Sequence, residues 1–166
     1  MRVLFDANVI IDFIIKREPF SDNAAKAIEL CVANNDIQAS IAAHTIPNLF
    51  YILRKHLSPE QRRDILLGIC RIFTVVGVDT DRLVSALQND GFTDFEDCLQ
   101  AECAKYFKAD YIVTRNTKDF SGSVVPAIEP SDFVDMHKSY RRPDEIIETA
   151  PKQAETGATS KEEEPD

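Results

Sequence analysis

Three things are scarce or missing in this chain of 166 residues: long apolar runs, paired cysteines and positive charge. No stretch has the apolar length of a membrane-spanning helix, and the N-terminus enters a strand directly instead of a signal-peptide segment. The four cysteines form no CxxC pair and lie in helix-like runs, which predicts reduced core residues and argues against a thiolate metal site. We therefore expect a soluble, cytoplasmic protein with no membrane partner.

Positive charge is scarce: the chain has 19 Lys and Arg but 28 Asp and Glu, which gives a formal net charge of −9. Non-specific affinity for nucleic acid comes mainly from phosphate neutralisation by Lys and Arg, so the composition argues against broad electrostatic capture of nucleic acid. Residues 141–166 hold four basic and eight acidic residues and so carry −4, which leaves −5 on residues 1–140.

The length and a hydrophobic content of 44% suit one compact domain with a single core. From Arg141 the composition turns to Pro, Glu, Lys, Thr and Ser, with little to bury. We predict a domain over residues 1–140 and a disordered acidic tail over residues 141–166.

Short apolar runs alternate with helical segments along the domain. Such alternation predicts a mostly parallel central sheet covered by helices on both faces, a three-layer α/β/α domain. The predicted strands are 2–5, 37–42, 73–78, 111–114 and an edge strand within 124–128, and the predicted helices are 21–33, 44–55, 58–72, 80–88 and one that starts at Thr93. Ser21 and Ser58 are expected to cap their helices, and Thr93 with Glu96 to form a capping box.

Polar residues follow two of the predicted strands at the point where each strand ends. Asp6 comes directly after strand 2–5, and residues 114–116 follow strand 111–114. Because parallel strands end at the same edge of a sheet, we expect these groups to lie close together. Asp97 lies on a helical face expected to be buried, where an unpaired carboxylate is costly unless it meets a cation.

Structural interpretations of the same acids stand beside the functional one. Asp6 and Asn8 suit the cap of a following helix, and Asp94 and Glu96 suit the dipole of a helix first turn. If the acids do gather, their oxygen ligands select a hard divalent cation, Mg²⁺ or Mn²⁺. Such an ion binds phosphate oxygen and activates water, which is the chemistry of phosphodiester hydrolysis.

Three motifs together carry a resemblance to a known family. Residues 6–8 (DAN), 95–101 (FEDCLQA) and 112–120 (IVTRNTKDF) occur in the order seen in PIN domains, the nuclease family that contains VapC-type toxins. The resemblance covers about residues 1 to 138. It implies a metal-dependent ribonuclease that binds Mg²⁺ or Mn²⁺ and takes RNA as substrate, often the toxin partner of an antitoxin protein and often a homodimer.

The resemblance also implies roles for individual residues. Asp6 matches the first acid of the family, Asp97 the acid of the late helix, and Asn116 a fourth position where the family carries Asp or Asn. Asn48 stands where the family usually has Glu or Asp, so one negative charge is missing from the implied metal site. Auxiliary acids and groups that hold the ligands by hydrogen bonds complete the implied site: Asp94, Asp119, Asn8, Thr114 and Glu96.

Positively charged groups near these residues are candidates for contact with RNA. Arg115 and Lys118 flank the predicted site, while Arg54 and Lys55 form either a basic rim for RNA phosphate or an ordinary solvated helix face. His44, just before its helix, is either a substrate contact or a capping or surface residue.

Two functional classes stay open. The first is an endoribonuclease, favoured by Asp6, Asp94, Asp97 and Asp119. The second is a catalytically weakened PIN domain that binds RNA or protein without cutting, favoured by Asn48. A phosphotransfer receiver domain lacks its acceptor Asp and Lys in suitable context, and a haloacid-dehalogenase phosphatase needs a second aspartate where Asn8 stands.

Overall fold

The computed structural model describes residues 1–140, so the predicted tail of residues 141–166 lies outside the described residues. Within residues 1–140 the chain forms one five-stranded sheet with the order β3-β2-β1-β4-β5. All four strand pairs are parallel, which confirms the predicted α/β class. The strands are β1 (Arg2–Phe5), β2 (Gln38–Ala42), β3 (Thr74–Val76), β4 (Tyr111–Val113) and the edge strand β5 (Ala127–Ile128).

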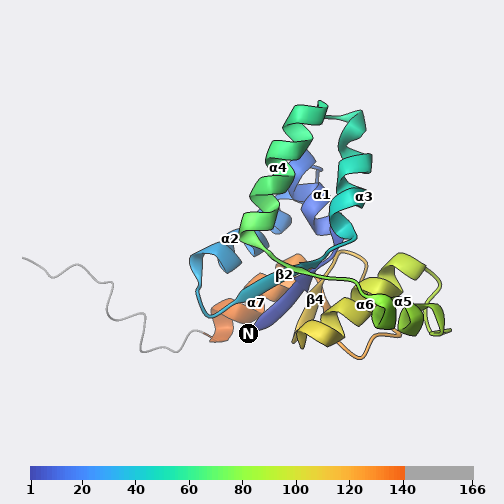
Figure 1. Ribbon diagram of the computed structural model, residues 1–166. Coiled ribbons are helices and arrows are strands. Elements are labelled where there is room, and N and C mark those ends of the chain that lie inside the picture. Colours follow the sequence, from blue (N-terminus) through green and yellow to red (C-terminus); the bar gives the residue numbers. More distant parts are fainter. Residues whose placement is uncertain (141–166) are drawn as a thin grey trace, which may run out of the picture.

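Helices cover the sheet on two sides, and one pair of helices projects away from it (Figure 1). The helices are α1 (Ala7–Ile15), α2 (Ser21–Ala33), α3 (Thr45–Ile52) with the 3-10 turn η1 (Leu53–Lys55), α4 (Pro59–Ile72), α5 (Thr80–Leu87), α6 (Phe95–Phe107), the 3-10 turn η2 (Thr117–Phe120) and α7 (Pro130–Tyr140). Figure 1 shows α3 and α4 standing up beside α1, whereas α5 and α6 lie together on the opposite side of the sheet from α2 and α7.

The central strand β1 explains why there are three layers. Its side chains alternate between two cores: Val3 and Phe5 pack with α1, α2 and α7, and Leu4 packs with α6. All three side chains are fully buried, as expected for a parallel strand covered on both faces. The Phe5 ring meets Phe73 and Phe133 edge to face, with centroids 5.2 and 6.2 Å away, so one aromatic anchor joins the sheet to the end of α4 and to α7.

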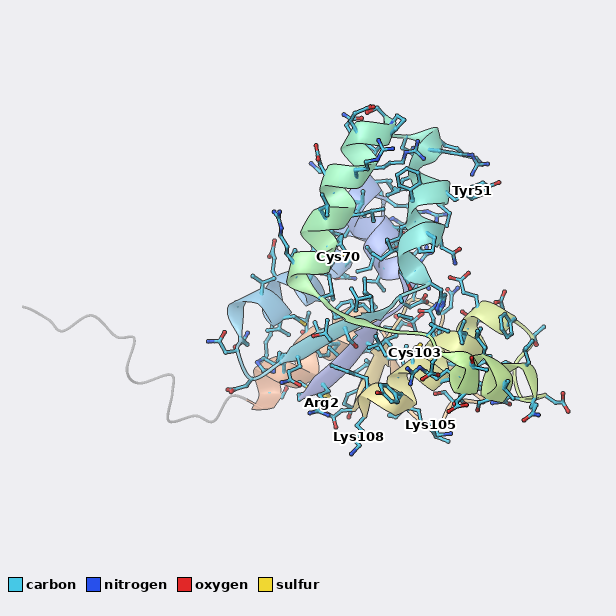
Figure 2. The ribbon with its side chains drawn as sticks, viewed as in Figure 1. Arg2, Tyr51, Cys70, Cys103, Lys105 and Lys108 are labelled. Carbon is cyan, nitrogen blue, oxygen red and sulfur yellow. The ribbon has the colours of Figure 1, made fainter. Side chains whose placement is uncertain are left out.

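Local signals in the sequence gave correct helix starts in some places and wrong ones in others. Ser58 caps α4 as predicted, and it forms a capping box with Gln61. The prediction for Ser21 is wrong, because it is the first residue of α2 and its N-cap is Phe20, which makes no side-chain capping bond. All four cysteines are free, but Cys70 is exposed and only the other three are core residues. Figure 2 labels Cys70 on α4 and the core residue Cys103.

No helix within residues 1–140 is long and apolar enough to cross a membrane.

Gly122 lets two loops next to the sheet edge approach each other. It follows η2, and a Cβ on this residue would lie 2.5 Å from the carbonyl oxygen of Gly91, in the turn before α6, and 3.3 Å from the Phe92 ring. Both neighbours belong to the segment that leads into α6, and backbone atoms cannot give way as a flexible side chain can.

Replacing Gly122 by Ala is therefore expected to lower the free energy of unfolding by about 1–3 kcal/mol, the usual cost of adding a methyl group where there is no room for it. Gly77 is the matched control, because a Cβ there meets nothing within 4 Å. Gly77→Ala should change stability by less than about 1 kcal/mol. Denaturant unfolding of the two variants measures the difference, and equal midpoints would show that the loops are not in close contact.

Candidate functional site

The site is built around Asp6, at the carboxyl end of the central strand. Asp6 is the N-cap of α1 and is only 4% exposed. Its backbone N–H donates to the Val113 carbonyl at 3.0 Å, so the ends of β1 and β4 lie side by side as predicted from their parallel order. A carboxylate buried to this degree is costly unless donors surround it.

Three side chains supply those donors. The Thr114 hydroxyl donates to Asp6 Oδ2 at 2.7 Å, and the Asn8 side-chain amide donates to the same oxygen. The Gln100 amide donates to Asp6 Oδ1 at 3.0 Å from α6. Burial raises the pKa of Asp6, and the hydrogen bonds from Thr114, Gln100 and the backbone N–H of Asn8 oppose that rise because they stabilise the ionised form.

The end of β4 is tied to the same network. Asn8 Nδ2 also donates to Thr114 Oγ1 at 3.1 Å, and Asn8 Oδ1 accepts the backbone N–H of Arg115 at 3.2 Å. The backbone N–H of Asn116 donates to Thr114 Oγ1 at 3.0 Å. Asn8 and Thr114 thus hold Asp6 by hydrogen bonds, as the sequence predicted, and they also position the exposed residue Asn116.

Asp94 caps α6, and this corrects the predicted capping box of Thr93 and Glu96. Asp94 Oδ1 accepts from the backbone N–H of Glu96 at 2.7 Å and of Asp97 at 3.4 Å. The helix begins at Phe95, one residue later than a Thr93 cap would give. The sequence predicted Thr93 as the cap with Asp94 in the first turn, but it is the Asp94 carboxylate that caps the helix.

Asp97 is the half-buried acid of the site. Burial, reinforced by the negative charges of Asp6, Asp94, Asp119 and Glu96, raises the pKa of Asp97 from its ordinary 3.8 to about 7. These acids come from the β1 end, α6 and η2, so the fold brings together the charges that the sequence placed far apart. Their mutual repulsion is what a bound cation would relieve.

The remaining predicted ligands are neutral or exposed. Asn48 is partly buried in α3, and its side chain makes no hydrogen bond to another residue within 1–140. Asn116 precedes η2 and Asp119 lies in it, and both are exposed. In the part of the chain that the structure describes, no three His, Cys, Asp or Glu side chains gather as a ready metal cluster.

The donor set nevertheless suits a hydrated divalent cation. Mg²⁺ is commonly held through only one or two carboxylates, with waters and substrate phosphates completing its shell. Asp6 and Asp97 are two such carboxylates, and Asn48 and Asn116 offer neutral amide oxygens. The residues present therefore fit Mg²⁺ or Mn²⁺ in charge and in ligand type.

Two residues beside the site were not singled out as site groups from the sequence. Gln100 is 1% exposed and contacts Asp6, yet a glutamine inside a helix gives no periodic or charge signal that would mark it. Asp12 in α1 is also 1% exposed. It lies about one and a half helical turns after Asp6, in a segment whose sequence is otherwise mostly apolar.

Arg115, predicted to contact RNA, is engaged inside the protein. Its Nε lies 3.0 Å from Asp12 Oδ2, and its guanidinium carbon lies 4.3 Å from the centre of the Phe20 ring. Burial raises the pKa of Asp12, and the charge of Arg115 opposes that rise. Lys118, the other flanking cation, is exposed.

His44 stands at the start of α3, in the N-cap position, but makes no capping bond. Both ring nitrogens are enclosed without a hydrogen-bond partner within the described residues. Burial lowers the pKa of His44, and the nearby charge of Asp6 opposes this, so a neutral imidazole is favoured beside the site.

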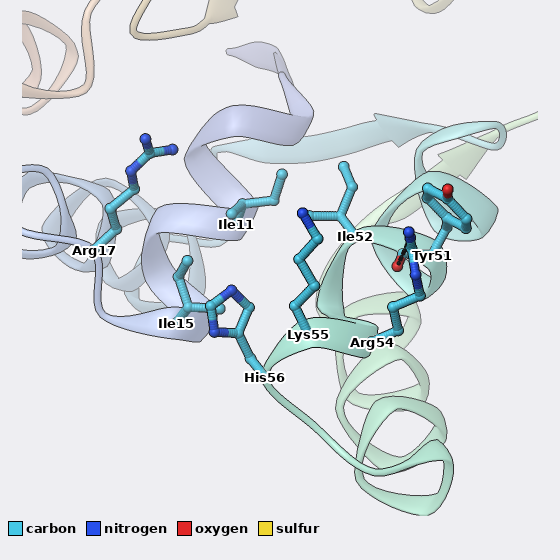
Figure 3. Close-up of a pocket in the computed structure, with 8 residues that line it drawn as sticks. All are labelled: Ile11, Ile15, Arg17, Tyr51, Ile52, Arg54, Lys55 and His56. Carbon is cyan, nitrogen blue, oxygen red and sulfur yellow. Dashed lines mark hydrogen bonds between the residues drawn. The ribbon is translucent and has the colours of Figure 1, made fainter.

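Arg54 and Lys55 line a separate groove of about 740 Å³ between α1 and the α3–η1 segment (Figure 3). Its walls combine aliphatic side chains, among them Ile11, Ile15 and Ile52, with the cations Arg17, Arg54 and Lys55. The Arg54 guanidinium stacks on the Tyr51 ring at 3.5 Å. None of the predicted acids lines this groove, so the basic rim and the acidic site are distinct surfaces.

Comparison with known proteins agrees with this fold. A sequence model described as a PIN domain matches residues 2–118, and the chain belongs to the PIN domain family. A curated relative, Ribonuclease VapC1 of Aquifex aeolicus (strain VF5), is 26% identical over 136 residues, which cover 80% of this chain and 92% of the relative.

Solved structures of similar fold come from toxin–antitoxin complexes. A toxin–antitoxin complex from Klebsiella pneumoniae contains a chain that is 25% identical, with a TM-score of 0.58 and coverage of 77% of this chain and 97% of that one. VapBC-1 from nontypeable Haemophilus influenzae gives 18% identity, a TM-score of 0.61 and coverage of 79% and 99%. The second likeness is one of fold alone.

Asp97 makes stability depend on pH. A carboxyl group whose pKa is raised by folding binds its proton more tightly in the folded state than in the unfolded state. The free energy of unfolding therefore falls as the pH rises from 3.8 to about 7, and it levels off above that. The Asp97→Asn substitution removes this pH-dependent loss of stability. In metal-free buffer at pH 8 the variant should be more stable than the wild type by on the order of 1 kcal/mol, a figure that allows for solvent screening.

The measurement is denaturant unfolding of both proteins between pH 4 and pH 8. Asp64→Asn, at an exposed position of α4, is the matched control and should leave the pH dependence as it is. A variant of Asp97 that is less stable at pH 8 would show that this carboxylate supports the helix start instead of straining it.

Proposed function

We propose that this protein is a metal-dependent endoribonuclease of the VapC type, which hydrolyses RNA phosphodiester bonds as the toxin of a toxin–antitoxin pair. The observation that carries the proposal is the buried Asp6, which accepts hydrogen bonds from three side chains and whose charge helps to raise the pKa of Asp97. Strongly shifted acids that gather in this way are typical of functional sites. Support also comes from membership of the PIN family and from the name of the Aquifex relative.

The proposed roles follow from where each group lies. Asp6 and Asp97 hold Mg²⁺ or Mn²⁺, with Asn48 and Asn116 as neutral oxygen ligands. When bound, the ion supplies positive charge at the phosphate and an activated water. Asn8 and Thr114 keep the Asp6 carboxylate oriented, Asp94 sets the start of the helix that carries Asp97, and Glu96 and Asp119 add negative charge that attracts the ion.

RNA would lie over the strand edge, where its phosphates meet the cation. Lys118 is the exposed basic residue next to this edge and is proposed to contact RNA. Arg115 is proposed to act mainly by fixing the loop that carries Asn116, since its guanidinium is already paired with Asp12. Arg54 and Lys55 are proposed to contact a part of the RNA that is remote from the reacting bond, along the groove of Figure 3.

The proposed partners are an antitoxin protein and a second copy of the chain, in the cytoplasm. The Klebsiella structure of similar fold is a toxin–antitoxin complex, which supports an antitoxin partner. Exposed apolar side chains are available for such contacts, for instance Ile52 and Leu87, at 39% and 69% exposure. The domain proper is proposed to be residues 1–140.

A second reading has one observation in its favour. Asn48 removes a charge at a helix position where the family usually carries an acid, and a weakened metal site would leave a PIN domain that binds RNA or protein without cutting. Cleavage assays of purified protein separate the two readings.

Cleavage is expected to need the metal and Asp97. Excess chelator should stop cleavage of RNA, and added Mn²⁺ or Mg²⁺ should restore it. Asp97→Asn should lower the rate by roughly 100-fold or more, as when a group that acts at the reacting phosphate is lost. Asp64→Asn again serves as the control. Equal cleavage with and without chelator would contradict the metal mechanism.

Restoring the missing charge at position 48 should strengthen the site. Asn48→Asp adds an anionic ligand on a helix already placed to supply it, so Mn²⁺ affinity should rise by about tenfold, or about 1.4 kcal/mol. Cleavage at limiting Mg²⁺ should rise with it, and the difference should fade at saturating metal. Calorimetric titration with Mn²⁺ measures the affinity.

Asn35→Asp is the matched control for net charge, because Asn35 is exposed in the turn before β2, at the opposite edge of the sheet. Equal Mn²⁺ affinity in Asn48→Asp and the wild type would place residue 48 outside the metal's surroundings. Stronger binding without any cleavage by either protein would favour the binding-module reading.

A further inference from the structure

Tyr51 and Arg54 form a stacked pair on one wall of the groove shown in Figure 3. Tyr51 is 64% exposed near the end of α3, and the Arg54 guanidinium carbon lies 3.5 Å from the centre of its ring. Arg54 Nη1 also donates a hydrogen bond to the Tyr51 carbonyl at 2.9 Å, which holds the guanidinium over the ring. Two planar groups are therefore already aligned at the surface of the groove.

The charge of this groove is opposite to that of the whole chain. Arg17, Arg54 and Lys55 line it, and no Asp or Glu is among its lining residues, whereas the chain has a net charge of −9. None of these three cations is in an ion pair within residues 1–140. Their charges remain available to an anionic ligand, and RNA supplies one anion at each phosphate.

A second exposed tyrosine shows the same stacking in a different setting. Tyr106 on α6 is also 64% exposed, and the Arg82 guanidinium carbon lies 3.7 Å from the centre of its ring. The Arg82 side chain, however, is only 12% exposed, and its Nη2 lies 3.0 Å from Asp79 Oδ2. That guanidinium is neutralised within the fold, whereas Arg54 is exposed and has no acidic partner within the described residues.

A stacked tyrosine and arginine suit the flat face of a nucleobase. Bases stack on aromatic rings and on guanidinium planes when they are unpaired, because the faces of bases inside a duplex are already covered. Ile11 and Ile15, on the α1 wall, offer apolar contact opposite the stacked pair (Figure 3). The groove volume of about 740 Å³ lies within the roughly 300–1,000 Å³ of pockets that hold small molecules, so there is room for a nucleotide.

We propose that the Tyr51–Arg54 pair is a subsite for one unpaired base of the RNA, and that it directs the protein to single-stranded RNA. The inference rests on the proposed function, because it takes RNA as the substrate. It goes beyond the contact proposed for Arg54 and Lys55, since charge alone attracts single strands and duplexes alike. The two planar groups discriminate between them.

The experiment is fluorescence anisotropy of a labelled uridine oligonucleotide titrated with the full chain, in chelator so that it is not cleaved. The same oligonucleotide paired with its adenosine complement is the duplex probe. Tyr51→Ala should weaken binding of the single strand by about tenfold, or about 1.4 kcal/mol, as expected for one lost stacking contact. Tyr51→Phe keeps the ring and should bind like the wild type. The duplex should bind equally to all three proteins.

Arg54→Lys separates stacking from charge, and it also carries the test if Tyr51→Ala does not fold. Lysine keeps the positive charge but lacks the guanidinium plane, so single-strand binding should weaken while its salt dependence stays the same. Lys55→Ala removes a charge instead. It should weaken binding of both probes and lower the slope of log affinity against log salt by about 0.7 for the single strand.

Tyr106→Ala is the matched control, because it removes an equally exposed tyrosine stacked with an arginine outside the groove, and it should bind both probes like the wild type. Single-strand affinity that falls with Lys55→Ala but not with Tyr51→Ala or Arg54→Lys would mean capture by charge alone and would overturn the inference. An equal loss for the duplex, or in Tyr106→Ala, would overturn it too. Cleavage of RNA by the wild type with Mn²⁺, measured alongside, keeps these results apart from the proposed nuclease. A wild-type chain that neither binds nor cleaves RNA overturns both.

Discussion

The structure depends on satisfying one carboxyl group, that of Asp6, with hydrogen bonds where water barely reaches it. Asp6 is 4% exposed at the end of the central strand, so it needs donors from its neighbours. Those donors come from α1 through Asn8, from the end of β4 through Thr114 and from α6 through Gln100. The same bonds that satisfy Asp6 therefore fix the three elements that make the site, and the loop with Asn116 follows because Thr114 also accepts its N–H.

A second consequence is that the fold holds acids together against their repulsion. Asp97 feels burial and the charges of Asp6, Asp94, Asp119 and Glu96, and its pKa is raised to about 7. Nothing in the packing of α6 requires this carboxylate, since Ala101 and Ala104 bury the helix face against the sheet and Asp94 caps its start. Electrostatic repulsion that contributes nothing to the stability of the fold is typical of functional sites. A divalent cation bound there, as proposed, would convert the repulsion into attraction.

The sequence predicted the parallel sheet and the meeting of Asp6 with residues 114–116, because strand ends and alternation are local signals that tertiary packing preserves. It failed where two local solutions compete or where only packing decides. Thr93 was predicted to cap α6, but the neighbouring Asp94, which can also accept from the first-turn N–H groups, is the cap that the fold uses. Cys70 lies in a helix like the other cysteines but on its exposed side. Gln100 and the Asp12–Arg115 pair carry no sequence signal, since their partners lie far away in the chain.

The central claim is that a divalent cation binds between Asp6 and Asp97 at the strand edge. Paramagnetic broadening by substoichiometric Mn²⁺ in the amide spectrum of the full chain tests this most directly, because broadening falls steeply with distance from the ion. The account predicts that the amide signals of Asn8, Cys98 and Arg115 disappear first while those of the groove residues Arg54 and His56 stay sharp. Broadening that spares Asn8 and Cys98 and appears at acids elsewhere on the surface would contradict it.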